Sequence, residues 1–170
     1  MTRHAAMEAE AATEAADAAE AGCSADEHVR YAYYLRAFRS VPADGELDLV
    51  ATVLRDEDQV MAQAAVVHHV NLRAAALGHG PDFTGWVTAM TEAVEGRPFI
   101  LQRIREWSLS AAITHGGPWD ADALTSASYW LQRRVAETTT SPRALAVLSQ
   151  DGGTRRIRNL AKAGRLKNRC

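Results

Sequence analysis

The 170-residue sequence contains only two cysteines, Cys23 and Cys170. Two cysteines do not make the disulfide framework of a small secreted protein, and they supply no cysteine-based zinc site. No stretch approaches 18 uninterrupted apolar residues, and residues 1–22 carry acids where a signal peptide needs an apolar segment. We therefore predict a cytoplasmic protein without a membrane span. The abundance of Ala and the excess of Arg over Lys are typical of bacterial proteins from high-GC genomes.

Signatures of catalysis and of bound metals or cofactors are also missing. The serines occur in no GxSxG or SxxK motif, and the glycine pairs at 116–117 and 152–153, which we interpret as turns, match neither GxxxxGK[ST] nor GxGxxG. His68 and His69 are neighbours, and neighbours on a helix point about 100° apart, so they cannot chelate one metal. We predict no catalytic residue, no metal and no cofactor, and interpret the histidines as surface or helix-cap residues. Whether the protein is an enzyme stays open, with a non-enzymatic role favoured.

Charge is nearly balanced overall but unevenly distributed. The 19 Lys and Arg residues and 21 Asp and Glu residues give a formal net charge of -2. Residues 1–26 contain six acids and one Lys or Arg, whereas residues 152–170 contain seven basic residues and no acid. We predict that residues 1–23 form an acidic, Ala/Glu-rich arm, helical or disordered, because no large side chain anchors it. Residues 24–170 are predicted to form a single all-helical domain with a basic C-terminal helix.

Apolar residues recur with helical spacing from residue 24 onward. Ser24 and Glu27 have the spacing of a capping box and predict the start of the first helix. Turns are predicted at 55–58, 78–81, 95–98, 115–118 and 151–153, and Ser141-Pro142 predicts a further helix start. Equivalent helix starts recur about every 38 residues, and strand-like alternation is missing. The sequence thus predicts an all-α fold of short antiparallel helix pairs.

Two of these predicted helices have specific apolar stripes. A helix is predicted to run from Asp120 until the threonines at 138–140, with Leu124, Ala127, Leu131 and Val135 on one face. The helix after the 55–58 turn is predicted to bury Val60, Ala64, Val67, Val70 and Leu77.

The segment LDLVATVLRDEDQVMAQAAVVHHV resembles a HEAT repeat. It contains an apolar helix, an acidic turn at Asp56 and Asp58, and then Val60 followed by small Ala64 and Ala65, where two helices approach closely. Near the end of the chain, RRVAETTTSPRALAVLSQDGGTRRIRNLA is similar to a unit of the leucine-rich variant repeat. The matching positions are Val135-Ala136, Ser141-Pro142, Leu145, Leu148, Asp151 and Ile157-Arg158. The resemblances imply a small HEAT-like α-solenoid or helical bundle over most of the chain, and they imply no chemistry.

The four tryptophans fall into two groups. Trp86, Trp107 and Trp130 fit helix faces and are predicted to anchor the core. Trp119 lies in the predicted loop Gly-Gly-Pro-Trp-Asp. It either packs against the start of the next helix or serves as a binding hot spot for a partner, and the sequence leaves both alternatives open.

The basic end of the sequence is the main candidate for a binding surface. Cations along one face of the last predicted helix would attract phosphate backbones, with an affinity that falls steeply with salt. An outermost solenoid helix also needs a polar outer face, whatever it binds. The candidate residues for binding a partner or nucleic acid are Trp119, Arg133, Arg134, Arg143, Arg155, Arg156, Arg158, Lys162 and Arg165.

Three functional hypotheses follow. The leading one is a non-enzymatic helical-repeat scaffold or adaptor that binds a protein partner, joins a larger assembly or associates with itself. The alternative is a nucleic-acid-associated protein that uses the Arg-rich C-terminal helices. The third is an enzyme resembling the HEAT-like DNA glycosylases, which work on DNA in a concave groove lined by aromatic and acidic residues. The sequence by itself places no acid beside the tryptophans.

Overall fold

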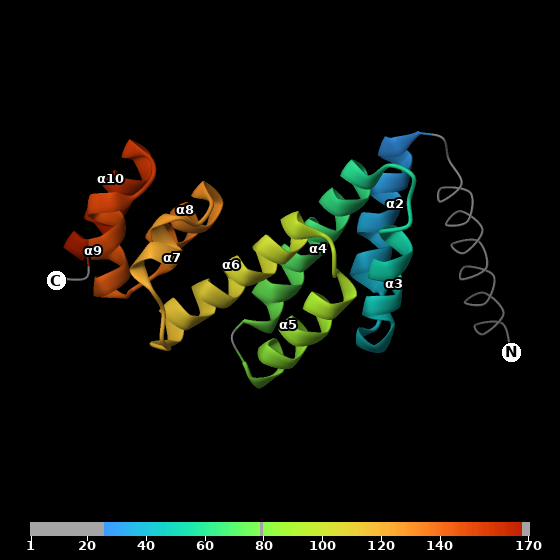
Figure 1. Cartoon of the computed structure of the whole chain (residues 1–170), viewed down its shortest axis with the longest axis horizontal. Helices are drawn as coiled ribbons and strands as arrows, with labels where there is room; N and C mark the ends of the chain where they lie inside the picture. Colours follow the sequence, from blue (N-terminus) through green and yellow to red (C-terminus); the bar gives the residue numbers. More distant parts are fainter. Residues whose placement is uncertain (1–25, 79, 168–170) are drawn as a thin grey trace, which may run out of the picture. The chain divides into compact units, whose positions relative to one another are not determined.

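The computed structural model describes residues 26–78 and 80–167, and all regular secondary structure in them is helical (Figure 1). The predicted all-α fold is therefore confirmed, while the acidic arm of residues 1–23 lies outside the described residues. No helix in the described ranges combines the length and the apolar character needed to cross a membrane. The elements are α2 (Glu27–Ser40), the 3-10 helix η1 (Ala43–Gly45), α3 (Glu46–Val53), α4 (Gln59–Leu77), α5 (Pro81–Ala93), α6 (Pro98–His115), α7 (Ala121–Thr125), α8 (Tyr129–Thr138), α9 (Pro142–Asp151) and α10 (Arg155–Lys167).

The chain divides into two compact units. The first contains the residues up to Arg73 together with Glu92–Ile100, and the second contains Ala74–Thr91 and the residues from Leu101 onward. Helices α4, α5 and α6 each contribute residues to both units. A single domain over residues 24–170 stays a prediction.

In the first unit, local capping determines where helices begin. Asp26 caps α2, because its carboxylate accepts a hydrogen bond from the His28 N–H at 2.8 Å. The predicted cap, Ser24, lies outside the described residues. The predicted turn at 55–58 is present between α3 and α4, where Asp58 Oδ1 accepts hydrogen bonds from the backbone N–H groups of Val60 at 3.1 Å and Met61 at 2.9 Å.

The predicted apolar stripe of α4 is partly wrong. Val60 is 82% exposed and Ala64 is also exposed, whereas Val67 and Val70 are buried as predicted. Between residues 60 and 70 only Gln63, His68 and His69 are not apolar, so periodicity cannot determine which side faces the core. The buried apolar residues of α4 are Met61, Ala62, Ala65, Val66, Val67, Val70 and Ala74.

The second unit contains a core formed by α6 to α10. Its buried residues are Ile113, Leu124, Leu131, Val135, Ala136, Ala144, Leu145, Leu148, Ile157 and Ala161. Helix α10 packs against α9 and α8, and a Cβ added at Gly164 of α10 would lie 3.2 Å from Leu145 Cδ2. The two helices are therefore in close contact at this position.

The helix predicted from Asp120 to residue 138 is interrupted, and α7 and α8 take its place. Two serines account for the break. Ser126 Oγ donates a hydrogen bond to the Asp122 carbonyl at 2.6 Å, and Ser128 caps α8 by accepting from the Leu131 N–H. Serine side chains compete in this way with helical backbone hydrogen bonds. Ser141 caps α9, with Pro142 as its first residue, as the sequence predicts.

Gln132 joins three segments of this unit. Its buried amide nitrogen donates to the carbonyls of Thr125 at 2.8 Å and Ala127 at 2.9 Å, and its oxygen accepts from the Gly153 N–H at 2.8 Å. The glycine pair at 152–153 is thus a turn whose second N–H is already hydrogen-bonded. A Cβ added at Gly152 would lie 2.6 Å from the Leu148 carbonyl oxygen, so only glycine fits there without movement.

Candidate binding surface

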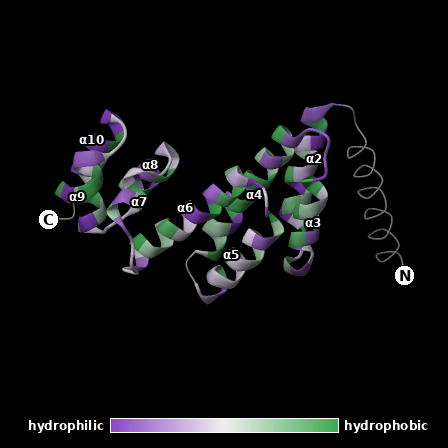
Figure 2. Ribbon diagram, viewed as in Figure 1, coloured by the Kyte–Doolittle hydropathy of each residue, from purple (hydrophilic) through white to green (hydrophobic). Residues whose placement is uncertain are grey.

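Helix α10 has one buried face and one cationic face. Ile157 and Ala161 are buried against α9 and α8, and the exposed residues include Arg155, Arg156 and Lys162. Figure 2 shows hydrophilic residues alternating with hydrophobic ones along this helix. No acid occurs between residues 152 and 170, so the cationic face has no carboxylate on its own helix.

The predicted cations of α10 differ in their contacts. Arg158 Nη1 donates to the Gly152 carbonyl at 2.5 Å, and Arg165 Nη1 donates to Ser149 Oγ at 3.0 Å. These two arginines help to hold α10 against the end of α9. Arg155, Arg156 and Lys162 form no ion pair with any carboxylate of the described residues. Their charges are therefore available to a partner.

A shallow, open depression of about 460 Å³ lies on this helix. Its lining combines cations, an amide and two apolar side chains: Arg155, Arg156, Asn159, Leu160 and Ala163. Basic, amide and apolar residues thus occur together on this part of α10.

The remaining predicted site residues do not line this depression. Arg133 Nε is 2.8 Å from Glu137 Oε1 one turn further along α8. The Arg143 guanidinium lies 4.4 Å from the ring centroid of Trp119. Trp119 is half-buried and packs against the core cluster that contains Leu124, at the start of α7. This packing is that of a side chain which fixes a helix start, and a binding role for Trp119 stays a prediction.

Arg134 belongs to a different group of residues, on α6 and α8. Its guanidinium carbon lies 4.1 Å from the ring centroid of Trp107 and 5.9 Å from that of Trp130. The Arg103 guanidinium carbon lies 3.7 Å from the Trp130 centroid, and the two indoles are 5.6 Å apart. The four residues form what we call the arginine–tryptophan cluster. Sequence reasoning missed it, although Arg103 precedes Trp107 by four residues and Trp130 precedes Arg134 by four.

Burial makes the charges of this cluster costly. It lowers the pKa of Arg103 and that of Arg134, because both guanidinium groups are partly removed from water. For Arg103, the nearby carboxylate of Glu106 opposes this effect, with 3.4 Å between Arg103 Nε and Glu106 Oε2. Arg134 Nε is buried and has no hydrogen-bond acceptor among the described residues.

Glu106 is the acid beside the tryptophans that the sequence did not locate. Its side chain is only 6% exposed, and Oε1 accepts a hydrogen bond from the Ser128 N–H at 3.0 Å. The carboxylate therefore holds the start of α8 and compensates Arg103, which is a structural role. A reaction of the glycosylase type stays a prediction that these contacts do not favour.

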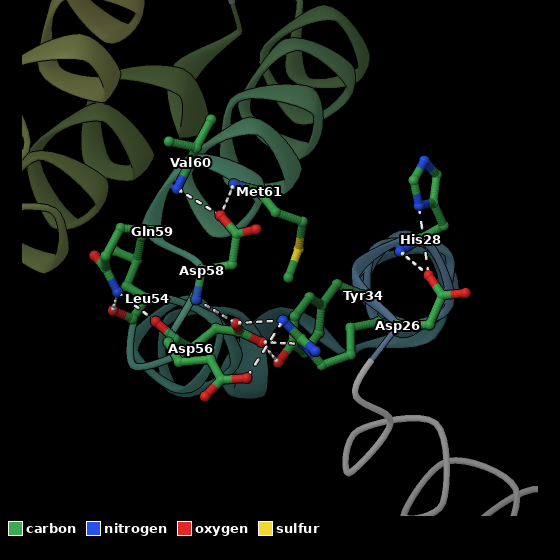
Figure 3. A network of polar contacts seen from close by, with 11 residues as sticks. Asp26, His28, Tyr34, Leu54, Asp56, Asp58, Gln59, Val60 and Met61 are labelled. Carbon is green, nitrogen blue, oxygen red and sulfur yellow. Dashed lines mark hydrogen bonds and ion pairs between the residues drawn. The ribbon is translucent and has the colours of Figure 1, made fainter.

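Two buried polar clusters lie in the first unit. In one, Asp56 Oδ2 accepts hydrogen bonds from Tyr34 Oη at 2.7 Å and from Arg30 Nε at 3.1 Å, and Oδ1 accepts from the Asp58 N–H at 2.8 Å (Figure 3). Burial alone would raise the pKa of Asp56, but these hydrogen bonds outweigh it and lower the pKa. Burial, with the hydrogen bond to Asp56, raises the pKa of Tyr34 to about 12.

In the other cluster, His69 Nε2 lies 2.7 Å from Glu46 Oε1, and Arg73 Nε lies 3.3 Å from Glu46 Oε2. The His69 ring stacks on Phe38 with 4.2 Å between centroids. The interpretation of this histidine as a surface or cap residue is therefore wrong, because His69 is buried and its partner lies on another helix. His79 lies outside the described residues. Within the described part of the chain, no group of three or more His, Cys, Asp or Glu residues is arranged to hold a metal ion.

Comparisons of the chain with protein-family models, with curated proteins and with solved structures give no match. The likeness to HEAT and leucine-rich variant repeats rests on the sequence patterns alone.

Proposed function

We propose that this protein is a non-enzymatic, HEAT-like interaction module of the cytoplasm that binds an acidic protein partner through α10. The observation that carries the proposal is the depression on α10, which is lined by Arg155 and Arg156, cations without a carboxylate partner among the described residues, and by the apolar groups of Leu160 and Ala163. Protein interfaces combine an apolar centre with a polar rim, and arginine is enriched among the residues that contribute most to binding. An acidic and partly apolar protein segment matches this lining.

Site-specific photo-crosslinking in the native host tests the proposal. A crosslinking residue at Asn159, which is exposed and lines the depression, is expected to capture a protein. The same residue at Arg36, exposed on α2, is the matched control and is expected to capture no such partner. Replacing Arg155 and Arg156 by Gln should remove the adduct at 159, whereas replacing Arg36 and Arg39 by Gln should leave it. Equal capture at 159 and 36 would exclude α10 as the binding surface.

Nucleic acid is the second candidate, and one observation favours it. Residues 152–167 carry six cations and no acid, so the helix can approach a phosphate backbone without repulsion from its own side chains. If this candidate is correct, the adduct at residue 159 is sensitive to nuclease. Binding to duplex or single-stranded DNA should then weaken steeply between about 0.05 and 0.2 M salt, with a shallower salt dependence for the Arg155→Gln, Arg156→Gln variant. Undetectable binding at about 0.15 M salt would exclude it.

A further inference from the structure

The arginines of α6 and α8 near the tryptophans differ in how their charges are compensated. Arg103 has the Glu106 carboxylate at 3.4 Å, and Arg133 has the Glu137 carboxylate at 2.8 Å. Arg134 forms no ion pair with a carboxylate of the described residues. In the arginine–tryptophan cluster, Arg103 thus has a carboxylate partner, whereas Arg134 has none among the described residues.

The N–H groups of the Arg134 guanidinium point away from the tryptophan rings. The N–H bonds of a guanidinium lie in its own plane, so a group that lies over an aromatic ring presents them at its edge. Trp107 is 2% exposed and holds the guanidinium at 4.1 Å, which fixes its position before any ligand arrives. Arg134 Nε is buried without an acceptor among the described residues, whereas the side chain as a whole is half-buried. An anion can therefore reach Arg134 through the terminal nitrogens of its guanidinium, Nη1 and Nη2.

We propose that Arg134, held against Trp107 and Trp130, is the binding site for a phosphate-type oxyanion. Phosphate accepts two parallel hydrogen bonds from the edge of a guanidinium, and its negative charge can balance the positive charge of Arg134. The pair is partly shielded from water by the indole rings, which strengthens its attraction. This site lies on α6 and α8 and does not depend on the proposed role of α10.

Titration of the full chain with inorganic phosphate tests the proposal. The side-chain Nε–H signal of Arg134 in ¹⁵N NMR is expected to shift and to saturate, and the fluorescence of the tryptophans should change with the same midpoint. Sodium chloride keeps the ionic strength constant. Arg134→Lys keeps the charge but loses the paired donors, and it should weaken binding about tenfold. Arg133→Gln is the matched control from the neighbouring position and should bind phosphate like the wild type.

The source and the class of the anion are separated by two further titrations. Adenosine monophosphate that binds at least as tightly as inorganic phosphate supports a phosphate ester as the ligand, and a preference for inorganic phosphate supports the free ion. A shift that never saturates, or one that Arg134→Lys leaves unchanged, overturns the proposal. Acetate binding as tightly as phosphate overturns it as well. Because the saturation of the NMR shift is measured on the unmodified chain, that part of the test does not depend on the folding of a variant.

Discussion

Glu46, the first residue of α3, and His69, within α4, are 23 residues apart in sequence, yet Glu46 Oε1 lies 2.7 Å from His69 Nε2. Both side chains are almost completely buried, and Arg73 contacts the second oxygen of the same carboxylate. One carboxylate thus connects α3 with two successive turns of α4. The contact helps to hold the two helices of the first unit together.

Replacing Glu46 by Ala should destabilise the protein by about 1–3 kcal/mol, because it leaves His69 buried without its partner and removes the ion pair of Arg73. Chemical denaturation followed by circular dichroism measures the change. Asp48→Ala is the matched control, since Asp48 lies on the same helix and is exposed, and it should change stability by less than about 0.5 kcal/mol. Equal effects of the two substitutions would show that the buried carboxylate contributes little.

Stability at high pH should depend on Tyr34. Its pKa in the folded protein is about 12 against an ordinary 10.0, so the unfolded chain ionises first as the pH rises. The contribution of Tyr34 is therefore complete below pH 10 and is lost as the pH rises towards 12. Unfolding midpoints between pH 8 and 12 should fall less steeply for Tyr34→Phe than for the wild type. Tyr129→Phe, which removes the hydroxyl of an exposed tyrosine on α8, should keep the wild-type slope.

Stability at low pH should depend on Asp56. Its pKa is lowered on folding from the ordinary 3.8, so the contribution of Asp56 is present above pH 3.8 and is lost as the pH falls through its folded pKa. Asp56→Asn should therefore flatten the loss of stability below pH 4, in thermal unfolding at a series of pH values. An acid transition that is unchanged in Asp56→Asn would contradict this role.

Two glycine substitutions should have opposite effects. Gly152→Ala places a Cβ 2.6 Å from the Leu148 carbonyl oxygen and 2.9 Å from Ile157 Cγ2, and the strain should cost about 1–3 kcal/mol. Gly85 is exposed in the interior of α5, and apart from its chain neighbours and the backbone of its own helix no atom lies within 4 Å of an added Cβ. Gly85→Ala should stabilise the protein by up to about 1 kcal/mol, because alanine has the higher helix propensity. The midpoint of thermal unfolding should therefore fall for Gly152→Ala and rise for Gly85→Ala.

Removing the amide of Gln132 should release the Gly153 N–H. Gln132→Leu keeps the shape of the side chain but leaves the carbonyls of Thr125 and Ala127 and this N–H without a partner, at about 1–3 kcal/mol for each group that stays buried. Hydrogen exchange at Gly153 should accelerate in this variant. Gln150→Leu, on the exposed side of α9, is the control and should leave the exchange rate unchanged.

The elements that the sequence predicted correctly depend on local signals. Ser141 and Pro142 mark the start of α9, and Gly96 ends the α5 segment with a φ of 76°, a conformation that glycine adopts without strain. In each case the signal lies within a few residues of the boundary it determines. Such signals are visible in one sequence without knowledge of the tertiary structure.

The features that the sequence did not predict depend on tertiary contacts between residues that are far apart in the sequence. His69 is buried in contact with Glu46, which lies on another helix, and Arg134 is held against Trp107, which also lies on another helix. The spacing of four between Trp130 and Arg134 predicts that the two are neighbours on one helix face. It does not predict that α6 brings a second tryptophan and a second arginine to the same place.

The hydrogen bonds of Gln132 also have a consequence for synthesis on the ribosome. Helices α7 and α8 are 5 and 10 residues long, which is too short for either to be stable alone. The side-chain oxygen of Gln132 accepts a hydrogen bond from the N–H of Gly153, which is synthesised 21 residues later. Until Gly153 has emerged, the side-chain oxygen of Gln132 is hydrated. Until the residues that follow it have emerged, α8 has no α10 to pack against. The segment from α7 to α10 therefore acquires its order only after α10 has emerged from the exit tunnel.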